Sequence, residues 1–148
     1  RRKYAANVTN MAAVADKVRS VSEDCRVVLE CTWAYAGKNN GGFSCVTEFY
    51  ENAGKGIKVM ARAADADVSP IRDAFRMANI ERPDILLFAD DGYHQSEYGS
   101  YLKSCVNYLV LFGEPFGETP SDCGLDPKKT ESLRKIAEAV VLGKKFCR

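Results

Sequence analysis

The sequence has neither a large net charge nor a long apolar run, which are the features that mark nucleic-acid-binding and membrane-spanning proteins. Its 148 residues carry a net charge of +1, which gives no reason to expect binding to nucleic acid or to an acidic membrane surface. The longest apolar run, around 106–112, contains Asn107 and ends at Gly113, so it is too short to span a bilayer. No signal peptide is visible, and the chain begins with Arg1 rather than Met. We therefore expect one globular domain without a membrane span, in a chain cut from a longer precursor.

The sequence also lacks the histidine and cysteine patterns that are typical of metal sites. The chain has one histidine and no Cys-x-x-Cys pair, so the sequence predicts no zinc site. An even count of six cysteines without metal spacing favours disulfides and an oxidising compartment, although a set of buried free thiols is the alternative. Cys105 lies on an apolar helical face and is predicted to be a buried free thiol. The disulfide candidates are Cys25, Cys31, Cys45, Cys123 and Cys147.

Six cysteines allow 15 disulfide connectivities, so the pairing does not follow from the sequence, and of two candidate pairs the first is the preferred one. Cys123 with Cys147 would join a late loop to the tail, and Cys31 with Cys45 would close a loop after the first strand. Alternatively, one cysteine tethers a missing portion of the protein. Asn7 begins an Asn-Val-Thr glycosylation sequon, which fits secretion.

Hydrophobic periodicity predicts short strands alternating with helices. The predicted strands are 26–31, 67–71 and 85–88. The predicted helices are 9 or 10 to 21, 46–64, 72–78, 97–112 and 129–142. This alternation predicts an α/β fold with a parallel sheet, in which sites lie at the carboxyl ends of strands. The strands are too few for a full doubly wound sheet, so we expect that a portion is missing.

Thr9 or Asn10 is expected to cap the first of these helices, and Gly54 and Gly56 weaken the prediction of the second. The inward apolar faces are predicted to be Met11, Val14, Ala15 and Val18 on the first helix and Leu133, Ile136, Ala137, Val140 and Val141 on the last.

The single histidine, His94, is the best candidate for chemistry. Asp91 lies three residues before it, close enough for the carboxylate to hold the imidazole. A hydrolytic serine needs a base for its proton, and that base needs a carboxylate to fix its tautomer and stabilise the imidazolium. An Asp-x-x-His spacing is common by chance, and a surface histidine beside acids is the alternative. Asp90 is expected to be a solvent-facing or structural acid.

The residues around this pair resemble a known family. Asp-Gly-Tyr-His-Gln-Ser-Glu-Tyr-Gly, residues 91–99, opens a helix late in an α/β chain. It resembles the last block of the SGNH/GDSL-type esterases, which usually reads Asp-x-x-His-Pro-(Ser/Asn)-x-x-Gly, with Gln95 here in place of proline. Residues 27–34 and 67–75 resemble the strand and the strand-to-helix step that precede this block in one bacterial-type branch. The resemblance covers about 14–113.

The resemblance implies a three-layer α/β/α fold and roles for individual residues. Asp91 would be the triad acid and His94 the general base. Ser96 would cap the following helix, and Gly99 would allow that helix to pack closely. Aromatic side chains would line a substrate pocket, with ordinary aromatic packing as the alternative. These aromatic residues are Trp33 and Tyr93.

The family's nucleophile and oxyanion blocks are not recognisable. Residues 39–42 (Asn-Asn-Gly-Gly) follow the wrong strand for the family's Asn block and are expected to be a surface turn. Ser44 lacks the strand-turn-helix context of a nucleophile elbow. Three explanations stay open: the serine is on an amino-terminal partner chain, the chain is a degenerate family member, or the sequence is incomplete. We favour the first.

The sequence thus predicts residues 1–148 to be the carboxyl-terminal portion of a single SGNH-type hydrolase domain. It would hydrolyse a small ester, with a carbohydrate ester as a mild preference, together with a second chain that carries the nucleophile. The chemistry needs no metal or organic cofactor. The main alternative is a non-catalytic, disulfide-containing binding or structural subunit on the same fold. A small disulfide-rich structural protein is a third, weaker interpretation.

Overall fold

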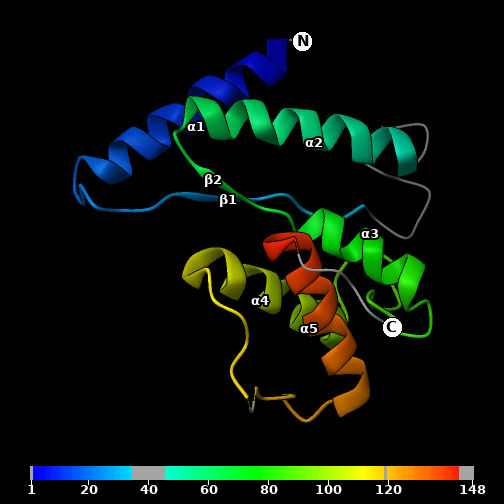
Figure 1. The fold of residues 1–148 in the computed structure, drawn as a ribbon. Helices are drawn as coiled ribbons and strands as arrows, with labels where there is room; N and C mark the ends of the chain where they lie inside the picture. The colour runs from blue at the N-terminus through cyan, green and yellow to red at the C-terminus, as the bar shows by residue number, and fades with distance from the viewer. Residues whose placement is uncertain (1, 35–45, 119, 144–148) are drawn as a thin grey trace.

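A computed structural model of the chain describes residues 2–34, 46–118 and 120–143. Helices and strands alternate as far as α3, and two further helices follow, as Figure 1 shows. In order they are α1 (Arg2–Arg19), β1 (Val28–Glu30), α2 (Val46–Ala63), β2 (Asp67–Ser69), α3 (Ile71–Glu81), α4 (Glu97–Phe112) and α5 (Pro127–Leu142). Among these residues, no helix is long and apolar enough to cross a membrane.

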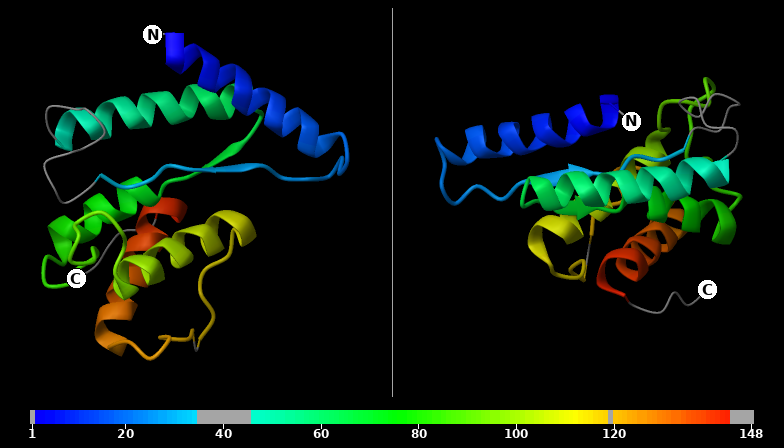
Figure 2. Two further views of the ribbon diagram at one scale, coloured as in Figure 1. Left: turned by 180° about the vertical axis from the view of Figure 1, so that it is seen from behind. Right: turned by 90° about the horizontal axis from the view of Figure 1, so that it is seen from above.

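The two strands pair in parallel, with Val28 opposite Asp67 and Glu30 opposite Ser69. Parallel neighbours need a crossover, and α2 provides it. Helices α1 and α2 lie on one side of the strands and α4 and α5 on the other (Figures 1 and 2). The fold is therefore mixed α/β with a small parallel sheet, which confirms the predicted class at this level.

The predicted strand 85–88 does not join this sheet. Ile85 and Leu87 are buried and Leu86 is 74% exposed, so the alternation that suggested a strand is present. However, the carbonyl of Leu87 accepts the amide N–H of Ser96, and Phe88 forms an isolated antiparallel bridge with Gln95. The strand prediction was wrong because this backbone bonds to the loop before α4 rather than to β2.

Several helix ends also differ from the predictions. Helix α1 starts at Arg2, and Thr9, expected to cap it, lies inside the helix and donates its hydroxyl to the carbonyl of Ala5 (3.2 Å). Helix α3 runs on to Glu81, and α5 starts earlier because Asp126 caps it by accepting the amide N–H groups of residues 128 and 129. Capping supplies partners for amides that have none within the helix.

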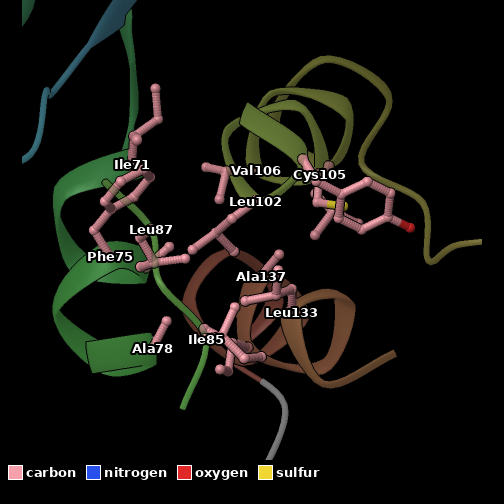
Figure 3. Packing of buried hydrophobic residues seen from close by; sticks show 14 residues of the cluster. Ile71, Phe75, Ala78, Ile85, Leu87, Leu102, Cys105, Val106, Leu133 and Ala137 are labelled. Atoms are coloured by element: carbon pink, nitrogen blue, oxygen red, sulfur yellow. The ribbon is translucent and has the colours of Figure 1, made fainter. Parts of the chain in front are cut away.

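The hydrophobic core joins α3, α4 and α5 with the segment around Ile85 and Leu87 (Figure 3). Phe75 and Leu102 are fully buried within it. The predicted inward face of α5 is confirmed, since Leu133, Ile136 and Ala137 are also fully buried there. On α1 the predicted face is only partly inward, because Ala15 is buried whereas Val14 is 59% exposed.

No disulfide joins the four described cysteines to one another, and two of them are buried and two at least partly exposed. They are Cys25, Cys31, Cys105 and Cys123. Cys105 is buried as predicted, and this burial raises its pKa to about 12. Cys45 and Cys147 lie outside the described residues, so the two expected pairings stay predictions. Asn7 is exposed on α1, and its glycosylation likewise stays a prediction.

Candidate active site

The Asp-His segment is a short loop closed at its base, just before α4. The amide of Ala89 donates to the carbonyl of His94, and the amide of Ser96 donates to the carbonyl of Leu87 (both 2.9 Å). Between these bonds, Gly92 adopts a left-handed conformation with φ 64°, which glycine reaches without steric cost. The loop thus turns tightly and holds His94 next to the start of the helix.

Asp91 uses both carboxylate oxygens within this loop. Its Oδ1 accepts the backbone N–H groups of Tyr93 (2.8 Å) and His94 (2.9 Å), which is the side-chain turn that aspartate favours. Its Oδ2 lies 2.6 Å from Nδ1 of the His94 ring. The predicted contact between Asp91 and His94 is therefore present. Because an ionised carboxylate only accepts hydrogen bonds, Nδ1 carries the proton and Nε2 is left as an acceptor.

The imidazole is open to solvent. The His94 side chain is 71% exposed and that of Asp91 49% exposed. Within the part of the chain that the structure describes, nothing hydrogen-bonds to Nε2. A neutral imidazole fixed at Nδ1 and open at Nε2 is the arrangement that a general base requires.

The pKa of the Asp91 carboxyl is lowered to about 2. The hydrogen bond from the His94 side chain is the largest cause, followed by those from the backbone N–H groups of Tyr93 and His94. Each stabilises the charged form. Folding lowers the pKa of this carboxyl, so the ionised carboxylate stabilises the folded state at any pH above the ordinary aspartate pKa. This contribution is lost as the pH falls from that value toward 2.

We expect a carbon-13 NMR titration of the Asp91 carboxyl to give a midpoint near 2. In His94→Ala the midpoint should rise toward the ordinary aspartate value because the largest stabilising bond is gone. The two backbone bonds should keep it from returning fully. A wild-type midpoint of about 4, the value of an unperturbed aspartate, would contradict the observed pairing.

Ser96 and Gly99 fix the start of α4, as predicted. The Ser96 hydroxyl accepts the amide N–H of Gly99 (3.1 Å) and donates to the carbonyl of Leu86 (2.6 Å). A Cβ at Gly99 would overlap with the carbonyl oxygen of Leu87 and lie 2.9 Å from Cβ of Gln95. The helix can therefore approach the core segment only because residue 99 has no side chain.

Gly99→Ala is expected to destabilise the fold by about 1–3 kcal/mol, because backbone atoms must move to make room. Chemical denaturation followed by circular dichroism measures this. Gly117→Ala is the matched control, since nothing lies within 4 Å of an added Cβ there. It should change stability by less than about 0.5 kcal/mol. Equal effects in the two variants would show that the close approach at Gly99 has no energetic role.

Trp33 and Tyr93 come together although they are distant in sequence. The indole N–H of Trp33 donates to the carbonyl of Tyr93 (3.1 Å), while its ring stacks on Phe75 (5.0 Å between centroids, 15°). The Tyr93 ring meets the His94 ring edge-on at 4.7 Å and is 48% exposed. Trp33 therefore anchors the loop on the core, and Tyr93 flanks the imidazole.

The sequence did not predict a set of polar contacts between α4 and the two strands, next to Trp33. Lys103 of α4 lies over the Trp33 ring at 6.0 Å and forms an ion pair with Glu30 at the end of β1 (2.8 Å). Asn107 adds a hydrogen bond to Glu30 (2.8 Å) and accepts one from the buried Ser69 hydroxyl (2.6 Å). These contacts tie α4 to both strands. Only tertiary structure brings them together, so the sequence carried no signal for them.

No described serine hydrogen-bonds to His94. The Ser96 hydroxyl is engaged with backbone groups, and Ser69 is fully buried. Ser44 and residues 39–42 lie outside the described residues. Across the described ranges, His, Cys, Asp and Glu side chains form no group of three that could hold a metal ion.

Comparison with known proteins shows that the chain has a fold similar to that of a solved structure. No family model and no curated protein matches the sequence. Among solved structures, the chain is similar to the crystal structure of a DUF4886 family protein from Bacteroides uniformis ATCC 8492, with a TM-score of 0.79 and 21% sequence identity. The match covers 97% of this chain but 59% of the other, so this chain spans less than two thirds of that structure's length. At this identity the likeness establishes that the two proteins share a fold.

Proposed function

We propose that the chain supplies the Asp-His part of a Ser-His-Asp triad in an ester hydrolase of the SGNH type. The observation that carries the proposal is the 2.6 Å contact between Asp91 Oδ2 and His94 Nδ1. It leaves Nε2 exposed as the proton acceptor. The cap by Ser96 and the close packing at Gly99 support the proposal, because they match roles implied by the resemblance.

In the proposed reaction, His94 Nε2 takes the proton of a serine hydroxyl as its oxygen attacks the ester carbonyl. Asp91 stabilises the imidazolium that forms. His94 then gives the proton to the leaving alcohol, and water releases the acid from the acyl-enzyme in the same manner. These steps need neither a metal nor an organic cofactor.

The proposal places the serine and the oxyanion donors outside the described residues, on an amino-terminal partner chain. The edges of the described sheet support a partner. This sheet has only β1 and β2, each with one edge not paired to another described strand. An unpaired strand edge can accept a strand of another chain. The added portion would complete a three-layer α/β/α fold.

The proposed substrate is a small ester, with acetylated carbohydrate as the first class to assay. The exposed imidazole and the half-exposed Tyr93 ring beside it suit an open site that accepts a polar alcohol. The proposed compartment is the secretory pathway or the exterior, and glycosylation of Asn7 would support it.

Fluorophosphonate labelling tests the proposal. The native protein is labelled with its co-purifying chains, and each chain is examined by mass spectrometry. We expect an adduct on a serine of a partner chain and no adduct after His94→Ala. An adduct on Ser44 would place the whole triad in this chain and overturn the partner. No adduct, with a known esterase labelled in parallel, would favour the non-catalytic subunit.

A further inference from the structure

A second feature of the molecule lies away from His94, in the cleft between α2 and α3. The cleft has a volume of about 530 Å³. Lys55 and Lys58 line it from α2, and Arg72 and Arg76 line it from α3. Among the described residues, Glu51 is the one carboxylate lining it. Cationic side chains therefore face this space from both helices.

Arg72 is held in place at the inner end of the cleft. Its side chain is only 14% exposed. The guanidinium donates to the backbone carbonyl of Tyr50 (2.5 Å) and twice to Asp73 Oδ1 (2.9 and 2.7 Å). Gly54 makes room for it, because a Cβ there would lie 2.8 Å from Cζ of Arg72. The guanidinium of Arg72 can therefore lie against α2 only because residue 54 is glycine.

The other cations of the cleft have no acidic partner among the described residues. Arg76 lies over the Tyr50 ring at 5.5 Å, and within the described ranges it forms no ion pair. Lys55 and Lys58 likewise pair with no described carboxylate, although Glu51 stands one helical turn from Lys55. With Asp73 offsetting Arg72, three cations and one carboxylate remain among the described residues that line the cleft. Like charges gathered in a concave site raise its potential and attract anions.

We propose that this cleft binds the oxyanion group of a small molecule, which is a phosphate, a sulfate or a carboxylate. Arg76 would donate to the oxyanion through its planar guanidinium, whose geometry matches these groups. Lys58 would add a charge from the opposite helix, while Arg72, whose charge Asp73 offsets, would form the rigid inner end of the cleft. The proposal rests on the cleft alone and is independent of the esterase proposal.

The test uses isothermal titration of the full chain, with any co-purifying partner, by inorganic phosphate, sulfate and acetate. Sodium chloride keeps the ionic strength constant. The double variant Lys58→Gln/Arg76→Gln removes two exposed cleft cations. The matched control Lys17→Gln/Lys128→Gln removes two exposed lysines on α1 and α5, neither of which lines the cleft.

We expect saturable binding of at least one oxyanion, weakened about tenfold or more in the cleft variant, because charge-assisted hydrogen bonds are lost. The control should keep its affinity within about threefold, since distant exposed charges are screened. The anion that binds most tightly identifies the chemical group. No saturable binding, or equal weakening in both variants, would overturn the proposal. Esterase activity is not part of this readout, so the two proposals fail separately.

Discussion

Replacing His94 with alanine is expected to lower kcat for ester hydrolysis by about 10³-fold or more in the assembled protein. The variant removes the group that takes the serine proton and later gives it to the leaving alcohol. The melting temperature should change by less than about 2 °C, because the side chain is 71% exposed and contacts mainly Asp91 and Tyr93. Steady-state assays with p-nitrophenyl acetate and an acetylated sugar measure the loss.

Rescue by imidazole separates a catalytic role from a structural one. Because His94 is open to solvent, added imidazole should reach the vacated position and restore part of the activity in His94→Ala. A misfolded variant would not respond in this way. If His94→Ala keeps wild-type turnover, His94 is not the base, and the non-catalytic subunit becomes the better interpretation.

Asp91→Asn is expected to lower kcat by about 10³–10⁴-fold, as in serine hydrolases whose triad acid is changed in this way. The amide oxygen can still accept the N–H groups of Tyr93 and His94, so the loop should keep its shape. The amide NH₂, however, would face Nδ1 as a donor. The imidazole would then carry its proton on Nε2, which is the wrong tautomer for a base.

Asp90→Asn is the matched control, because it removes the same charge one residue away. Asp90 is exposed, and no described side chain forms an ion pair with it. Its kcat should stay within about threefold of wild type, as expected for a surface change away from the reacting atoms. Similar losses in both variants would show that the general negative charge of the loop matters rather than the specific contact of Asp91.

The local part of this site could be predicted from the sequence. Asp91 and His94 are three residues apart and Ser96 directly precedes α4, so neighbouring backbone atoms determine these three positions, whereas the role of Gly99 was implied by the resemblance. Short-range spacing of this kind needs no knowledge of the tertiary fold. The same holds for the inward face of α5, where the helical period places Leu133 on the core side.

The rest depends on which elements meet in space. Trp33 reaches the carbonyl of Tyr93 across 60 positions of sequence, and no spacing rule connects them. The cleft between α2 and α3 was missed for the same reason. Gly54 was interpreted only as a weak point of a helix, whereas it makes room for Arg72. The segment 85–88 has the alternation of a strand, but that pattern records burial against helices and not pairing with a sheet.

The closed base of the Asp-His loop has a mechanical consequence. The carbonyl of Leu87 accepts the amide of Ser96, and the hydroxyl of Ser96 holds the first turn of α4. These hydrogen bonds connect the loop that carries the imidazole to the first turn of α4. We expect a substrate that displaces His94 to shift α4 against α5, and the methyl signals of Leu102 and Leu133, which lie in the core between these helices, to report this shift although neither residue touches the site.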